Sequence, residues 1–349
     1  MKKVLGIFRG FPGLGRVVAG VSLLETLRDK YGYEVKFISY LQGNRYIESR
    51  GYLDLHEATH MDYCSIGLLP TNKMGVYIHD TIKQFAPEVI VVDGEPLILH
   101  SIKISHPDIK VVTLLNPADV DNSTNDKEAM EFFNAIYSMS DLAIVHGLRR
   151  LKGDERYSNM ISTNTIIRPE IISVKNHPTS NIYCILGGGT VNVGSQFEES
   201  TIRIGKLCLN VASYFPNYTM HIICSSKNIY EALNLNRCTE NIRLYEEIIP
   251  AEKYYSDACL IITRSGRNTL SELLYLGIPT ISYVSGDSYR KVEQFQNIES
   301  LNVESIKPIL DDISVEEYKI TIKGMLDLGK KKNKFIPSNE ICIDKILAL

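Results

Sequence analysis

The chain has 349 residues, 44% of them hydrophobic, and a formal net charge of −3 at pH 7. This length favours two domains, and the near-neutral charge argues against general nucleic-acid binding, which depends on clustered positive charge. No apolar run approaches the roughly 20 residues of a membrane-spanning helix, so we expect at most peripheral contact with a membrane.

The seven cysteines and eight histidines show no metal-binding pattern. No two cysteines form a CxxC pair, and the histidines lack the spacing of metal ligands. An odd, scattered set of cysteines suits a reducing compartment, and the first ten residues lack the apolar run of a signal peptide. We therefore expect a cytoplasmic protein, peripheral at most at the inner face of the membrane.

Short apolar runs alternate with helical segments through the N-terminal half. Such runs are typical of strands buried on both faces, and their alternation with helices predicts a parallel, doubly wound sheet. The predicted strands are residues 4–8, 34–39, 89–92, 111–115 and 142–145, and the first predicted helix is residues 16–27.

A glycine-rich turn links the first predicted strand to the first helix. Its glycines are Gly10, Gly13 and Gly15, a spacing that does not fit the GxGxxG pattern of dinucleotide-binding proteins. Arg16 follows at the helix start. An arginine cannot act as a base at neutral pH, but its guanidinium can bind a phosphate or a carboxylate through two hydrogen bonds.

Two carboxylates follow the strand predicted at residues 89–92. Asp93 and Glu95 flank Gly94, at the end of a strand where open α/β sheets bind their ligands. The two carboxylates belong either to an ordinary turn or to a functional site, and we favour the functional interpretation.

A polar, irregular stretch after residue 145 marks a domain boundary. We expect a first domain of residues 1–160, a second domain of residues 161–335 and a terminal helix within residues 336–349. Predicted strands of the second domain include residues 182–186, 220–224 and 242–244. Three glycines, at positions 187–189, follow the first of them and would let a ligand approach the backbone closely.

A strand-helix-strand unit at residues 260–284 is the most regular part of the second domain. Small and polar residues at 265–269 suit a helix start, since Ser and Asn side chains can cap the first turn. The spacing of a buried helix face is occupied by Leu270, Leu273, Leu274 and Gly277. Gly277 and the following Pro279 predict the end of the helix.

The start of this helix is a candidate anion site. Its free backbone N–H groups and the helix dipole favour an anion, most often a phosphate. Glu272 lies two residues after Leu270, about 200° around the helix and away from the buried face. Its carboxylate could bind the diol of a ribose, or it could be a solvent-exposed group on an ordinary capped helix.

Residues 263–283, TRSGRNTLSELLYLGIPTISY, resemble the donor-binding segment of GT-B glycosyltransferases. The likeness is to the lipid II-forming N-acetylglucosaminyltransferase family and its shorter bacterial and archaeal relatives. It implies that Ser265 and Gly266 hold a nucleotide diphosphate, that Glu272 binds the ribose, and that Gln294 contacts the donor sugar. The implied donor-binding residues are Gly188, Gly189, Thr190, Arg264, Ser265, Gly266, Arg267, Asn268, Thr269, Glu272 and Gln294.

Two N-terminal segments carry the same resemblance. Gly13-Leu14-Gly15 is similar to the family's GxGLGH turn, which implies contact with the acceptor, but Arg16 stands at the position of its histidine. Asp93-Gly94-Glu95-Pro96 resembles the family's DxEP motif. The implied catalytic residues are Asp93 or Glu95, as the base that deprotonates an acceptor hydroxyl, and Arg16.

The resemblance implies an α/β protein with the GT-B fold, in which two Rossmann-like, doubly wound domains face each other across a cleft. The terminal helix would return to the first domain. The implied reaction transfers a sugar from a nucleotide-diphosphate donor, UDP-linked, to an unidentified acceptor hydroxyl, with no metal and no cofactor. Two alternatives stay open: a nucleotide-sugar hydrolase of the pseudaminic-acid-pathway type, and a non-catalytic nucleotide-sugar-binding protein, which the missing histidine favours.

Overall fold

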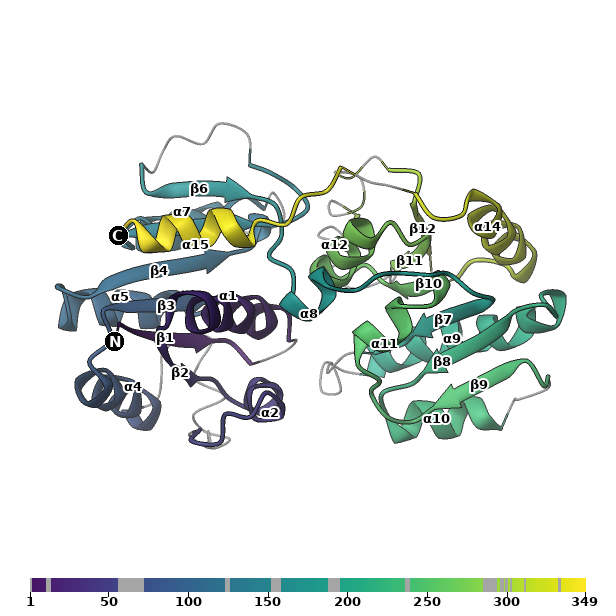
Figure 1. Ribbon diagram of the computed structural model, residues 1–349, viewed down its shortest axis with the longest axis horizontal. Helices are drawn as coiled ribbons and strands as arrows, with labels where there is room; N and C mark the ends of the chain where they lie inside the picture. The colour runs from purple at the N-terminus through teal and green to yellow at the C-terminus, as the bar shows by residue number, and fades with distance from the viewer. Residues whose placement is uncertain are drawn as a thin grey trace. The chain divides into compact units, whose positions relative to one another are not determined.

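The chain forms two compact units in the computed structural model (Figure 1). Unit 1 consists of Met1–Arg168 and Pro337–Leu349, and unit 2 is the contiguous segment Pro169–Ile336. The structure describes residues 2–10, 14–55, 72–122, 126–151, 158–187, 195–235, 239–284, 294–295, 298, 301, 303–310, 312–331 and 334–349.

Unit 1 is built on a parallel sheet with the strand order β2-β1-β3-β4-β5-β6. Alternate residues of its central strands enter two different hydrophobic clusters, so the sheet is covered on both faces. The strands are β1 (Lys3–Phe8), β2 (Glu34–Ile38), β3 (Val89–Asp93), β4 (Lys110–Leu115), β5 (Leu142–His146) and β6 (Met160–Thr163). The helices are α1 (Gly15–Tyr31), α2 (Gln42–Ser49), α4 (Asn72–Phe85), α5 (Pro96–Ser105), α6 (Pro117–Val120), α7 (Lys127–Tyr137) and α15 (Asn339–Leu347).

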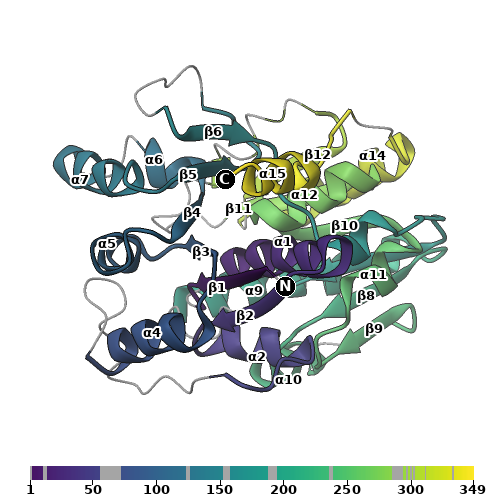
Figure 2. The same cartoon turned by 60° about the vertical axis from the view of Figure 1, so that its left-hand side comes forward.

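Helix α15 packs against α1 and β5 of unit 1 (Figure 2). Cys342, Ile343 and Ile346 are buried in the same hydrophobic cluster as the residues of β1 and α1. At the start of the helix, Asn339 is buried and bonds to Ile167 twice. Its Oδ1 accepts from the Ile167 N–H at 3.0 Å, and its Nδ2 donates to the Ile167 carbonyl at 2.7 Å.

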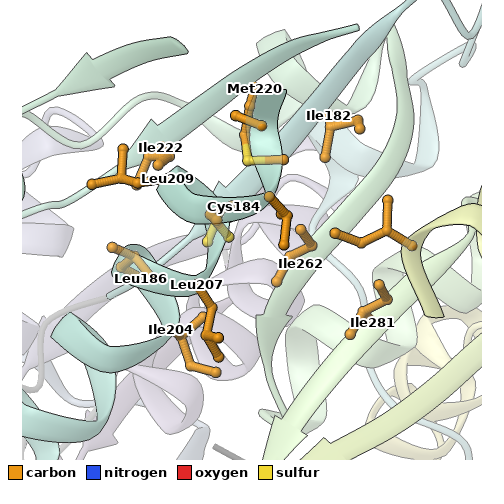
Figure 3. Packing of buried hydrophobic residues seen from close by; sticks show 14 of the residues in the cluster. Ile182, Cys184, Leu186, Ile204, Leu207, Leu209, Met220, Ile222, Ile262 and Ile281 are labelled. Atoms are coloured by element: carbon orange, nitrogen blue, oxygen red, sulfur yellow. The ribbon is translucent and has the colours of Figure 1, made fainter. Parts of the chain in front are cut away.

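Unit 2 has its own parallel sheet, with the strand order β12-β11-β10-β7-β8-β9. The strands are β7 (Asn181–Ile185), β8 (Thr219–Ile223), β9 (Ile242–Tyr245), β10 (Ala258–Arg264), β11 (Thr280–Val284) and β12 (Ile306–Leu310). The helices are α8 (Pro169–Ile172), α9 (Ser195–Val211), α10 (Lys227–Asn234), α11 (Ala251–Tyr255), α12 (Arg267–Leu276) and α14 (Val315–Leu328), with a 3-10 turn at Ala212–Tyr214. Figure 3 shows the core, in which Ile182, Cys184 and Met220 of the sheet belong to the same hydrophobic cluster as Ile204 and Leu207 of α9.

The strand-helix-strand unit predicted at residues 260–284 is confirmed as β10, α12 and β11, with the two strands parallel. Gly277 ends α12 in the left-handed region, with φ of 71°, and its N–H bonds to the carbonyl oxygens of Leu273 and Leu274. A Cβ at Gly277 would lie 1.9 Å from the carbonyl oxygen of Lys331. Glycine is therefore needed here both for its conformation and for the space it leaves.

Two edge strands were not expected from the sequence. Strand β6 is short and mostly half-buried, and its sequence carries no apolar run that would mark it as a strand. Strand β12 exposes Lys307 and Pro308, and a proline within a sheet is tolerated at an edge, where its missing N–H is not needed for pairing.

The boundary between the units also differs from the expected one. Residue 160 is the first residue of β6, which pairs with β5 and therefore belongs to the sheet of unit 1. Unit 1 continues to Arg168, and the chain returns to it between Ile336 and Pro337. The sequence does not predict this boundary, because an edge strand without an apolar run, such as β6, cannot be distinguished from a linker.

The described residues include neither a membrane-spanning helix nor a cluster of metal ligands. No helix in this part of the chain is long and apolar enough to span a bilayer. Within the same residues, no group of three or more His, Cys, Asp or Glu side chains is placed to hold a metal ion.

Candidate active site

Each sheet has one point at which the connections turn in opposite directions, and residues singled out from the sequence lie beside both points. In unit 1, β1 and β3 are neighbours, and the chain runs from β1 outward to β2 but from β3 outward to β4. In unit 2, β7 and β10 are neighbours in the same manner. Open α/β sheets bind their ligands at the carboxyl ends of the strands at such switch points.

Arg16 bridges two carboxylates at the switch point of unit 1. It lies in the first turn of α1, where Nη1 donates to Asp93 Oδ1 at 2.6 Å and Nη2 donates to Asp119 Oδ1 at 2.7 Å. Asp119 lies in α6, and its second oxygen accepts from the Asn116 N–H at 2.7 Å. The sequence suggested that Arg16 could bind a phosphate or a carboxylate, and the chain itself supplies two carboxylates to it.

Glu95 has a separate set of partners beside this bridge. Arg9 donates from Nε to Glu95 Oε1 at 3.2 Å, and Tyr40 donates from Oη to the same oxygen at 2.8 Å. Among the residues that the structure describes, no hydrogen bond reaches the second carboxylate oxygen, Oε2. The two bonds therefore fix the carboxylate through one oxygen and leave the other for a ligand.

Gly94 allows the end of β3 to reach both arginines. Its φ of 81° lies in the left-handed region, which favours glycine. A Cβ at this position would lie 2.6 Å from Cδ of Arg16 and 3.0 Å from Cβ of Arg9. A side chain on Gly94 would thus displace the arginines from Asp93 and Glu95.

Burial and charge act differently on the carboxylates of this cluster. The side chains of Asp93 and Glu95 are only 1% and 2% exposed. Burial raises the pKa of Glu95 above its ordinary 4.5, and the charge and hydrogen bond of Arg9 with the hydrogen bond of Tyr40 offset this only in part. Burial also acts to raise the pKa of Asp119, but the charge of Arg16 and the hydrogen bonds from Arg16 and Asn116 outweigh it and lower that pKa. Glu95 is therefore the more basic of these two groups.

The structure brings together Arg16, Asp93 and Glu95 from the set predicted in unit 1. Leu14 is the residue before α1 and Gly15 its first residue, so both belong to the helix start that carries Arg16. Gly13 lies outside the described residues. The turn and the strand-end segment are thus joined by the ion pair between Arg16 and Asp93.

Three members of the cluster were missed in the sequence: Arg9, Tyr40 and Asp119. Arg9 directly follows β1, Tyr40 lies two residues after β2, and Asp119 lies four residues after β4. A search for charged and phenolic side chains just beyond each predicted strand would have found them, because the carboxyl ends of parallel strands share one edge of the sheet.

The start of α12 in unit 2 is formed by a glycine. Its N-cap residue is Gly266, which has no side chain to cap the first turn, so the expected capping by a Ser or Asn side chain is wrong. Gly266 is exposed, and a Cβ added to it would meet no described atom within 4 Å. Backbone N–H groups at an uncapped helix start are suited to binding an anion.

Ser265 fails to cap the helix because its hydroxyl is used inside unit 2. The residue is buried, and its Oγ lies 2.7 Å from Ser282 Oγ and donates to the Tyr283 carbonyl at 3.1 Å. These bonds tie the turn after β10 to β11. Any contact of Ser265 with a ligand would come from its backbone.

The other predicted donor-binding residues of this turn lie at the surface of α12 or against α9. Arg264 ends β10; its Nη2 donates to Thr201 Oγ1, and its guanidinium carbon lies 6.0 Å from the centre of the Tyr283 ring. Arg267 donates from Nε to Asn268 Oδ1 at 3.2 Å. Arg264, Arg267, Asn268 and Thr269 are all half-buried.

Glu272 is buried, contrary to the expectation that it points away from the core. Its side chain accepts a hydrogen bond at 3.3 Å from Oη of Tyr255, a residue of α11, through Oε2. The expectation failed because Tyr255, from a different helix, reaches this side of α12. Gln294 is half-buried, and Gly188, Gly189 and Thr190 lie outside the described residues.

Comparison with known proteins identifies a protein family that part of the chain matches. Residues 190–340 match the glycosyltransferase family 28 C-terminal domain. The chain is 22% identical over 379 residues to the UDP-N-acetylglucosamine--N-acetylmuramyl-(pentapeptide) pyrophosphoryl-undecaprenol N-acetylglucosamine transferase of Clostridium novyi (strain NT). That alignment covers 100% of this chain and 98% of the relative.

Solved structures share the fold over the whole chain. MurG of Acinetobacter baumannii superposes with a TM-score of 0.64 at 13% identity, covering 100% of both chains. The UDP-GlcNAc 2-epimerase of Neisseria meningitidis superposes with a TM-score of 0.63 at 13% identity, covering 99% of this chain and 100% of that one. The expected fold of two Rossmann-like domains is thereby confirmed.

The names of these two structures give different reactions, so the shared fold alone does not decide between transfer and epimerisation. The family 28 domain and the transferase relative decide it. The chain is a glycosyltransferase with the GT-B fold that resembles MurG.

Proposed function

We propose that this glycosyltransferase moves a sugar from a UDP-linked donor to an acceptor hydroxyl without a metal ion, and that Glu95 is its base. The observation that supports this most directly is the environment of Glu95 at the switch point of the first sheet. Its burial raises its pKa, and its Oε2 is unbonded among the described residues. A carboxylate base is most effective when its pKa is raised toward the working pH.

Glu95 fits this role better than Asp93, the other base considered from the sequence. The Asp93 carboxylate is bonded to Arg16 at 2.6 Å and is almost fully buried. Taking up a proton would weaken that ion pair and leave the Arg16 charge with one carboxylate fewer. We assign Asp93 to holding Arg16, and Arg9 and Tyr40 to holding Glu95 through Oε1.

The donor would bind in unit 2, with its diphosphate at the start of α12. Support comes from the glycine at the N-cap, from the lack of any described atom within 4 Å of a Cβ placed on Gly266, and from the family 28 match over residues 190–340. Glu272, oriented by Tyr255, is our candidate for the ribose. Contacts of Gln294 and of Gly188, Gly189 and Thr190 with the donor stay predictions.

In the proposed step, the acceptor hydroxyl oxygen attacks the anomeric carbon of the donor sugar as Glu95 Oε2 accepts the hydroxyl proton. The bond between the anomeric carbon and the diphosphate oxygen breaks, and UDP leaves with the electron pair. The N–H groups and the dipole at the start of α12 would stabilise the negative charge that develops on the diphosphate. Charge stabilisation by these groups is the reason why no metal is invoked.

The test is release of UDP from a panel of UDP-sugars by the full-length protein, with and without EDTA and with a panel of hydroxyl acceptors. We expect UDP and the correct donor to raise the melting temperature, since ligands that bind only the folded state stabilise it. We expect UDP release to require an acceptor and to survive EDTA. Activity that disappears in EDTA and returns with Mg²⁺ would contradict metal independence.

The same assay separates the two alternatives. Steady release of free sugar without any acceptor would identify a hydrolase. Tight donor binding with no turnover under any acceptor would identify a binding protein. If the protein turns over its donor, by transfer or by hydrolysis, Glu95→Gln distinguishes a catalytic carboxylate from a structural one, because only a catalytic role predicts lost turnover with intact donor binding.

A further inference from the structure

The cations at the switch point of unit 1 are already neutralised by the protein. Arg16 is bonded to Asp93 and Asp119, and Arg9 is bonded to Glu95. The cluster therefore holds two guanidinium groups and three carboxylates, an excess of one negative charge. Among the described residues, the largest effects of charge on Arg16 and Asp119 come from members of this cluster.

An anionic acceptor group would meet unfavourable electrostatics here. A phosphate or carboxylate near the cluster would be repelled by the excess negative charge, and burial makes such repulsion stronger than it would be in water. To bind Arg16 it would have to displace Asp93 or Asp119. Separating a buried ion pair in this way leaves an uncompensated charge in the protein.

A neutral hydroxyl meets complementary groups at the same place. Arg9 is 27% exposed and uses only Nε in its bond to Glu95, so its terminal amino groups make no hydrogen bond among the residues described. Glu95 offers Oε2 as an acceptor, and the Asp119 side chain is 20% exposed. A hydroxyl both accepts and donates a hydrogen bond, so it can bond to Arg9 and to Glu95 together without adding charge.

We propose that the acceptor group received by this cluster is an uncharged polyol, such as the ring hydroxyls of a sugar, and that phosphorylated or carboxylated groups are discriminated against. This inference rests on the proposed function, because it names the acceptor class of the same site.

The experiment measures binding to a glycan array by the full-length protein in the presence of UDP. The array carries neutral oligosaccharides, the same sugars as 6-phosphates, and sugars with carboxylates. We expect neutral members to bind, and their phosphorylated counterparts to bind at least about tenfold more weakly, which corresponds to roughly 1.4 kcal/mol. Preference for the phosphorylated members, or no binding to any neutral member, would overturn the proposal.

Asp119→Asn provides a gain of binding as a second readout. It removes the excess negative charge and releases Nη2 of Arg16, so phosphorylated members should bind about tenfold more tightly than they bind the unaltered protein. The matched control is Glu131→Gln, which removes a carboxylate from the exposed surface of α7. It should leave the ratio of neutral to phosphorylated binding unchanged. An unchanged ratio in Asp119→Asn would overturn the proposal.

Failure of the proposed function would give a different result. In that case UDP-sugars would not raise the melting temperature and no UDP would be released. The ratio of neutral to phosphorylated binding is measured without turnover, so it still reports on the acceptor cluster.

Discussion

The two switch points of this protein differ in the groups that form them, which are side chains in unit 1 and backbone in unit 2. In unit 1, charged side chains are bonded to one another, with Arg16 between Asp93 and Asp119 and with Arg9 on Glu95. In unit 2, the residue at the helix start is Gly266, which is exposed and has no described atom within 4 Å of the position of a Cβ. The exposed surface at this helix start is therefore backbone rather than side chain.

The difference matches the chemistry proposed for each unit. Moving a proton requires a side chain whose pKa is adjusted by its surroundings, whereas an anion can be held by peptide N–H groups alone. Substitutions in the cluster of unit 1 should therefore change turnover or stability. Substitutions at the helix start of unit 2 should change donor binding alone.

Glu95→Gln should have the largest effect. Glutamine keeps the size of the side chain but cannot accept the proton, so turnover should fall by roughly 10²–10⁴-fold. Donor affinity, measured by the thermal shift with UDP, should be unchanged. Near-normal UDP release in this variant would remove Glu95 from the proposed role.

The pH dependence of the unaltered protein sharpens this prediction. Because the pKa of Glu95 is raised above 4.5, the acidic limb of the turnover profile should have its midpoint above 4.5 and should be absent from the residual activity of Glu95→Gln. The same pKa shift acts on the free energy of unfolding in the opposite direction: turnover should increase with pH, whereas stability should decrease. The contribution of Glu95 is fully present below its unfolded pKa of 4.5 and is lost as the pH rises through the higher folded pKa.

Asp93→Asn should mainly reduce stability. It breaks an almost fully buried ion pair, and such a loss costs about 3–5 kcal/mol of unfolding free energy, measured by denaturant titration. The control is Asp121→Asn, which breaks the ion pair with Arg149 at the surface and should cost less than about 1 kcal/mol. Equal losses of unfolding free energy in both variants would show that the buried ion pair stabilises the fold no more than the surface ion pair does.

Gly266→Ala should weaken the donor without weakening the fold. The φ of Gly266 is −77°, which alanine adopts readily, but the added methyl group would occupy the open space beside the helix start. Losing a charge-assisted bond to a phosphate oxygen there corresponds to about 1.5–3 kcal/mol, or roughly 10–150-fold in affinity by calorimetry with UDP. Unchanged affinity would move the diphosphate away from α12.

Gly324→Ala is the matched control and should have the smallest effect. This glycine lies within α14, and a Cβ there also meets no described atom within 4 Å. Alanine in a helix interior is favoured over glycine by roughly 0.5–1 kcal/mol, so the melting temperature should rise slightly while UDP affinity stays the same. A loss of UDP affinity in this variant would mean that Gly→Ala substitutions act on unit 2 as a whole.

The fold was largely predictable because its signals are local. The leucine spacing of α12 and the glycine at its end lie within a few residues of each other. Strands β6 and β12 were missed because their pairing to a neighbouring strand, rather than an apolar run, makes them strands.

The site was predictable only where its residues adjoin one another in sequence. Asp93 and Glu95 could be found together after one strand. Their partners could not, because the bond from Tyr40 to Glu95 spans 55 residues and the bond from Arg16 to Asp119 spans 103. The burial of Glu272 depends in the same way on Tyr255, which belongs to a different helix.

The path of the chain through unit 1 has a consequence for synthesis on the ribosome. Cys342 and Ile346 of α15 complete the hydrophobic cluster that Val4 and Phe8 of β1 begin. Unit 2 is contiguous and can fold as soon as it leaves the exit tunnel, while unit 1 must wait with an incomplete core until residues 337–349 emerge. The unit that is synthesised first is thus completed last, and during this interval its apolar surface is most in need of a chaperone.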